Sequence, residues 1–161
     1  MDILERLLLH DVWTTGKVLT HCVGLNDDQL DRGFDVGHGT LRATLVHLID
    51  NVEVWTDLML ARPPRLEPGD ESLAGLTARY HRASAEFGAL ARQIAAQGRL
   101  DELWLDTLDQ PPKHKSYGGA LAHVLTHNHA HRVELLHILQ RLGVENLIEG
   151  DVLGWEEQAR A

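Results

Sequence analysis

Apolar residues recur at alternating steps of four and three between Thr40 and Pro63. The positions are Leu41, Leu45, Leu48, Val52, Trp55 and Met59. Because an α-helix completes a turn every 3.6 residues, this spacing places all six side chains along one stripe. The segment is therefore predicted to be a helix that packs against other helices, with Thr40 as its N-cap and an end before Pro63-Pro64.

Three further segments have the same helical period. They run from about Asp2 to Cys22, from Asp70 or Ser72 to Gly98, and from about Gly119 to Leu142. We therefore predict an all-α protein, with one four-helix-bundle domain over residues 1–161. Two of the linkers are long enough to span such a bundle, so the helices need not follow a simple up-down-up-down order.

The linker before the last long helix contains an alternating segment, ELWLDTL. Alternation of this kind predicts a short strand, and a return strand can follow Pro111-Pro112. A lone hairpin is only marginally stable unless it packs against the rest of the protein. The tail is expected to extend the bundle with a short helix around Trp155.

Charge and composition narrow the classes of partner. The formal net charge is −9, which argues against nucleic acid because phosphate binding needs clustered Lys and Arg. No apolar run approaches the roughly 20 residues that span a bilayer, so no membrane partner is expected. The single cysteine, Cys22, excludes an internal disulfide. Together with an N-terminus that lacks a secretion signal, it favours a cytoplasmic protein.

The segment HVLTHNHAHRVELLHIL, which begins at His123, holds five histidines. At 100° per residue, with Val124 at zero, His127 falls at about 300° and His131 at about 340°, within the buried stripe. The others lie elsewhere on the helix. His129 and His137 are expected on the solvent side, and His123 on the flank beside Glu134.

Two inward histidines at i and i+4 can bind one metal ion, because their side chains converge one turn apart. The alternative is that each is a hydrogen-bonded core residue. A third ligand could come from His47, at the edge of the buried side of the helix that starts near Thr40. Three further histidines, His38, His81 and His114, are expected to be exposed. For Asp11 and Thr15 two roles stay open: each could be a partner of the site's ligands or a helix-end residue.

The runs THNHAHRVELLHILQRLGV and GTLRATLVHLIDNVEVW resemble the last and second helices of the DinB/YfiT-like metalloprotein superfamily. LLLHDVWTTGKVL is similar to its first helix. The resemblance, over about residues 7–144, implies an up-down-down-up bundle, a homodimer, and a divalent ion, often nickel or zinc, held by His47, His127 and His131. One departure stands out. Many members have Gly-Gln after His-Arg, whereas this chain has Val133-Glu134, and Glu134 could bond a ligand histidine, act as an acid or base, or simply be exposed.

Characterised members of that superfamily include transferases that use a thiol such as bacillithiol or mycothiol. The resemblance therefore implies a metal-dependent thiol S-transferase acting on an electrophilic small molecule, with no role for Cys22. Two alternatives stay open. One is hydrolysis by metal-bound hydroxide, with Glu134 as base; the other is a non-catalytic, metal-binding stress-response protein.

Overall fold

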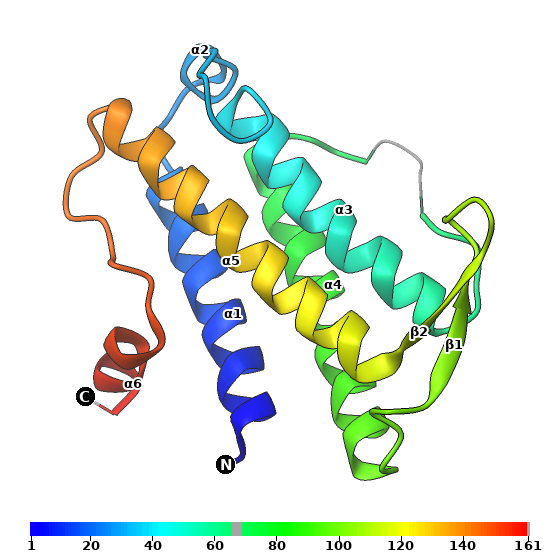
Figure 1. Cartoon of the computed structure of the whole chain (residues 1–161). Helices are drawn as coiled ribbons and strands as arrows, with labels where there is room; N and C mark the ends of the chain where they lie inside the picture. The colour runs from blue at the N-terminus through cyan, green and yellow to red at the C-terminus, as the bar shows by residue number, and fades with distance from the viewer. Residues whose placement is uncertain (66–68, 161) are drawn as a thin grey trace.

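The computed structural model describes residues 1–65 and 69–160 and is built mainly from helices (Figure 1). Four of the helices are long: α1 (Ile3–His21), α3 (Leu41–Met59), α4 (Leu73–Ala96) and α5 (Tyr117–Arg141). The other elements of the described residues are short: α2 (Asp27–Leu30), α6 (Val152–Arg160), β1 (Leu103–Asp106) and β2 (Lys113–Ser116). The all-α prediction is confirmed. Residues 66–68 and 161 of the predicted domain lie outside the described part.

Each long helix begins at a side chain that accepts a hydrogen bond from the backbone N–H three residues later. The caps of α3 and α4 are Thr40, bonded to Ala43 at 3.0 Å, and Ser72, bonded to Gly75 at 3.0 Å. Both were predicted as helix starts. Ser116 caps α5, so that helix begins two residues before the predicted Gly119. Such caps each stabilise a helix by about 1 kcal/mol because they satisfy an N–H that has no partner within the helix.

The long helices form a closed ring of contacts. α1 packs against α4 and α5, and α3 packs against the same two helices. Figure 1 shows α1 and α5 running in one direction and α3 and α4 in the other, which is an up-down-down-up order. In this arrangement α3 and α5 lie side by side and antiparallel, so that side chains from both helices can meet where the two helices are in contact.

The apolar stripe of α3 lies in the core, as its spacing predicts. Leu41, Leu45 and Leu48 are fully buried, and Val52 is 1% exposed. They pack with apolar residues of the other long helices into two core clusters. Burial of each such side chain stabilises the fold by roughly 1.5–3 kcal/mol, so packing of this stripe sets which face of α3 points inward.

A buried polar network joins the four long helices. Asp11 of α1 forms an ion pair with Arg132 of α5 and accepts a hydrogen bond from Tyr80 of α4 at 3.0 Å. Asn128 of α5 donates to Asp11 at 3.4 Å and accepts from Asn51 of α3 at 3.2 Å. Asp11 is therefore an internal partner and not a helix-end residue.

This network fixes the rotation of α5 about its axis. Asn128 and Arg132 are one turn apart and point towards α1. His127 and His131 each precede one of them, so they lie about 100° around the helix. They face α3, where His47 is located.

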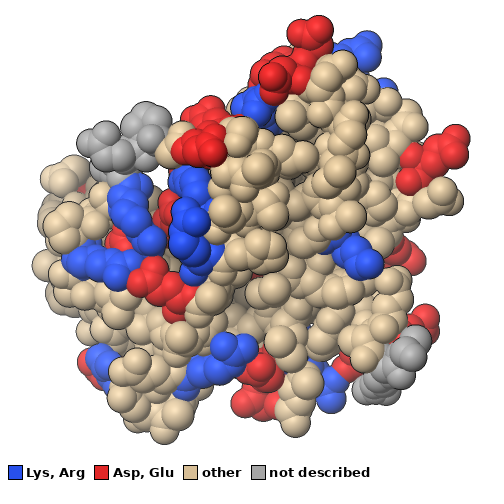
Figure 2. All heavy atoms as spheres, turned by 180° about the vertical axis from the view of Figure 1, so that it is seen from behind, with Lys and Arg blue, Asp and Glu red and all other residues tan. Residues whose placement is uncertain are grey.

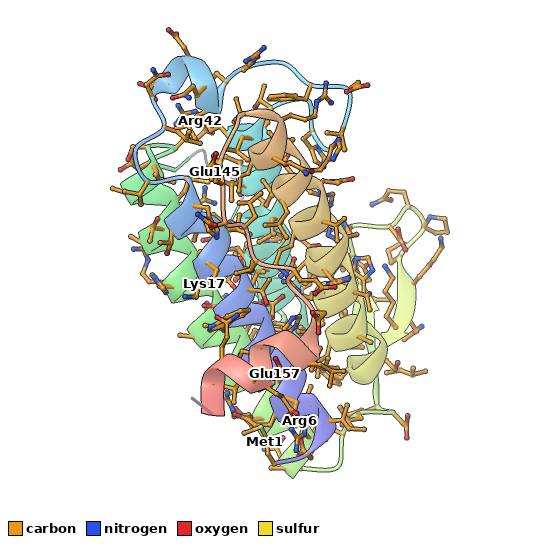
Figure 3. All side chains as sticks on the ribbon, turned by 90° about the vertical axis from the view of Figure 1, so that its left-hand side faces the viewer. Met1, Arg6, Lys17, Arg42, Glu145 and Glu157 are labelled. Atoms are coloured by element: carbon orange, nitrogen blue, oxygen red, sulfur yellow. The ribbon has the colours of Figure 1, made fainter. Side chains whose placement is uncertain are left out.

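The predicted hairpin and final helix are both present, and each is anchored by a buried tryptophan. Trp104 of β1 packs edge-on against Trp55 of α3, with ring centroids 6.1 Å apart. Trp155 of α6 packs near His10 of α1, whose Nε2 lies 2.9 Å from the carbonyl oxygen of Gly150. Figure 3 shows α6 lying across the N-terminal half of α1. Both extensions are stabilised by contacts with the bundle.

The short helix α2 was not anticipated within the predicted loop. Arg42 at the start of α3 holds it in place, with hydrogen bonds of 2.7 Å to Asp31 and 2.5 Å to Asp27. Figure 3 shows Arg42 beside α2. These contacts fix the chain before α3 against the end of the bundle.

Charged side chains of both signs are interspersed over the face seen in Figure 2. Some of the protein's charges are paired: Arg62 and Arg65 both form ion pairs with the buried carboxylate of Asp57 and with Glu86. Among the described residues, no helix is both long enough and apolar enough to cross a membrane.

Candidate metal centre

Four histidine side chains meet where α3 packs against α5. His47 comes from α3, His127 and His131 come from α5, and His38 comes from the loop that precedes α3. The ring centroid of His47 lies 5.2 Å from that of His127 and 4.7 Å from that of His131. The His127 and His131 centroids are 4.4 Å apart, and their Nε2 atoms are 3.4 Å apart.

These spacings fit a shared ion. Two nitrogens that bind one ion tetrahedrally at about 2.0–2.1 Å lie about 3.3 Å apart. The corresponding ring centroids lie about 4.5–5.2 Å apart for bond angles of about 90–110°. The three pairs formed by His47, His127 and His131 fall within or close to this range. The rings of the three histidines expected from the sequence therefore lie together, but the ring nitrogens that come within 4.8 Å of one another belong to His38, His47 and His131. The assignment of His47, His127 and His131 as ligands stays a prediction.

The protonation of these rings also suits a metal ion. Burial, followed by the proximity of the neighbouring imidazoles, lowers the pKa of His47 from its ordinary value to about 4. Burial, followed by the proximity of His131, lowers the pKa of His127 as well. Both rings are therefore neutral near pH 7, and each offers a nitrogen lone pair without first having to lose a proton.

One ring nitrogen of His127 has no hydrogen-bond partner within the described part of the chain. This atom, Nδ1, is buried. Leaving a buried polar atom unpaired costs about 1–3 kcal/mol. Coordination of an ion through Nδ1 would remove this cost, whereas coordination through Nε2, the atom that lies 3.4 Å from Nε2 of His131, would leave it in place.

Glu134 orients one of the three rings. Its Oε2 lies 2.6 Å from Nδ1 of His131, one turn earlier on α5. A carboxylate in this position accepts the Nδ1–H and leaves Nε2 of the ring unprotonated and directed at the cluster. Of the roles considered for Glu134, the structure therefore shows the hydrogen bond to a candidate ligand.

The loop histidine was missed by the sequence reasoning. His38 is exposed, as expected, but its ring stacks on His47 with centroids 3.8 Å apart. One nitrogen each of His38, His47 and His131 lie within 4.8 Å of one another. The signal was present in the flanking Gly37 and Gly39, whose φ angles of +60° and +86° fold the loop back over α3.

The other histidines lie outside the cluster. His129, His137, His81 and His114 are exposed, as predicted. His123 is also exposed and lies at the margin of the site, with its ring 5.2 Å from His127 and 4.8 Å from Trp55.

The model of the DinB family matches residues 1–157, which is nearly the whole chain. The chain belongs to the DinB family. This family is associated with metal binding, and the histidine cluster is a place where a DinB-family chain of this sequence could hold an ion. No curated protein sequence matches the chain.

Proposed function

We propose that this DinB-family protein is a metal-dependent thiol S-transferase. In this proposal His47, His127 and His131 hold a nickel or zinc ion, and a low-molecular-weight thiol of the bacillithiol or mycothiol type is joined to an electrophilic small molecule. The observation that carries the proposal is the spacing of these three rings, which matches that of three ligands on one ion.

The site would make a thiolate available at neutral pH. A bound divalent ion would supply a positive charge that stabilises the thiolate and so lowers the pKa of a thiol bound to it. The sulfur then forms a C–S bond with the electrophilic carbon, the leaving group departs with its electron pair, and the thiol proton passes to solvent. Three imidazole ligands suit this step because they are neutral and leave at least one position free for the thiol.

Glu134 has a place in thiol transfer that does not require it to act as a base. A hydrolase would need a group that accepts a proton from water. The Oε2 of Glu134 is already engaged with Nδ1 of His131 at 2.6 Å. Its role in the proposed reaction is to hold that proton and keep His131 directed at the ion.

The margin of the site offers an apolar surface for the electrophile. Trp55 is half-buried and lies beside His123, with ring centroids 4.8 Å apart. Lys115 of the hairpin lies over the Trp55 ring, with Nζ 4.8 Å from its centroid. Binding of a small molecule against this indole would exclude water from the sulfur nucleophile.

Monochlorobimane tests the activity, because its fluorescence increases when a thiol displaces chloride. The metal-loaded protein is incubated with bacillithiol or mycothiol and this reagent. We expect conjugation that is lost in His131→Ala and retained in His129→Ala, a matched control on the exposed side of α5. Elemental analysis should find about one ion per chain in the wild type and much less in His47→Ala.

Other results would assign another function. Turnover of esters or amides without thiol would indicate a hydrolase. Stoichiometric metal without either activity would indicate a metal-binding protein, and absence of metal binding would overturn the proposal. We also expect the protein to be a homodimer and to be located in the cytoplasm. Light scattering of the purified protein measures the oligomeric state.

A further inference from the structure

The loop that carries His38 is held at both ends. At its start Arg42 binds Asp31, with Nε 2.7 Å from Oδ1, and at its end Thr40 caps α3. Within the loop the N–H of Phe34 donates to the carbonyl of Gly39 at 2.7 Å. The loop is therefore a closed turn over the first residues of α3.

The turn is built against the cluster. The N–H of His38 donates to Oγ1 of Thr44 at 3.0 Å, which sets the histidine one turn before His47 on the surface of α3. A Cβ on Gly37 would meet Thr44 Oγ1 at 2.7 Å and Glu134 Oε2 at 3.3 Å. With φ of +60° as well, this close approach requires glycine. The turn therefore lies against the same carboxylate that orients His131.

His38 lies within reach of a shared ion, although its present position is not that of a ligand. Its ring centroid is 5.3 Å from that of His131, which fits two ligands of one ion. Its distance of 3.8 Å from His47 is too short, because two rings on one ion need about 4.5 Å or more. A shift of about 1 Å off the face of His47 would correct this distance, and the loop's exposed position leaves room for it.

We propose that His38 is a fourth protein ligand. When an ion binds to His47, His127 and His131, the imidazole of His38 leaves its stack on His47 and takes the remaining position. A substrate thiol then has to displace His38, so the loop retains the ion between turnovers and competes with thiol binding. This inference rests on the proposed metal site, but it does not depend on the transfer reaction.

Cobalt(II) provides a readout that is independent of activity, because its visible absorption reports the number and kind of ligands. In His38→Ala we expect stoichiometric Co²⁺, altered visible bands, and an affinity at least about tenfold weaker in competition with a chelator. The affinity for 2-mercaptoethanol, followed by its effect on these bands, should increase, since no ligand has to be displaced. His114→Ala, which removes an exposed histidine of the hairpin, is the control and should match the wild type.

A second variant separates the position of His38 from its chemistry. Gly37→Ala keeps the imidazole but should move the turn away from Thr44, and we expect the same direction of change as in His38→Ala. If His38→Ala leaves the Co²⁺ bands and affinity unchanged, His38 is not a ligand. Loss of Co²⁺ binding in His131→Ala would then still support the proposed three-histidine site. A wild-type protein that binds no Co²⁺ would overturn both proposals.

Discussion

Asp11 should be one of the most costly residues to remove from this bundle. Its carboxylate is 6% exposed and the guanidinium of Arg132 is 3% exposed, so water screens this ion pair very little. Asp11→Ala leaves a buried cation without its partner. Breaking a buried pair in this way costs about 3–5 kcal/mol, because the remaining charge stays desolvated.

Asp11→Ala also removes the hydrogen bond from Asn128, whose length of 3.4 Å makes it a weak contact. Tyr80 also donates to the backbone carbonyl of Asp11 at 3.0 Å, which the substitution retains. For a chain of 161 residues, a loss of 1 kcal/mol lowers the melting temperature by roughly 2–4 °C. We therefore expect Asp11→Ala to melt about 10 °C below the wild type.

Urea unfolding followed by far-ultraviolet circular dichroism measures the loss directly. Glu5→Ala is the matched control on α1, since it breaks an ion pair with Arg92 whose side chains are 30% and 48% exposed. That exposed pair should contribute only about 0.2–1 kcal/mol. If Asp11→Ala loses no more stability than Glu5→Ala, the ion pair of Asp11 with Arg132 does not hold α5 in its observed rotation.

Two further outcomes are expected. Glu134→Gln should weaken metal affinity by about 10–100-fold in chelator competition without unfolding the protein, because His131 loses the carboxylate that orients it. Burial lowers the pKa of His10, so below its ordinary pKa of 6.5 the unfolded chain binds a proton that the folded chain does not. The free energy of unfolding should therefore fall between pH 7.5 and 5.5, and less steeply in His10→Phe than in the wild type. An equal slope in both proteins would contradict this.

Much of the architecture could be predicted from local patterns. The stripe that begins at Leu41, the caps Thr40 and Ser72, and the strands on either side of Pro111-Pro112 all depend on interactions between residues close in the chain. Such interactions leave a period or a residue type that can be recognised without knowledge of the fold.

The candidate site was predictable only in part. His127 and His131 are one turn apart on the same helix, so the helical repeat alone places them together. His47 was a candidate from its position on the helix, and the resemblance to a family strengthened this assignment, because the direction of its side chain depends on how α3 packs beside α5. His38 was missed, since its contact with His47 results from a glycine turn whose conformation has no periodic pattern.

The order of residues thus determined the helices, their apolar stripes and the pair of imidazoles on α5. Tertiary packing decided the remainder: the rotation of α5, set by Asp11 and Arg132, and the meeting of His38 and His47 with that pair. The physical reason is the distance along the chain over which each kind of interaction acts. Backbone hydrogen bonds and helical spacing act over a few residues, whereas the position of one helix against another depends on the burial of side chains that are distant in the chain.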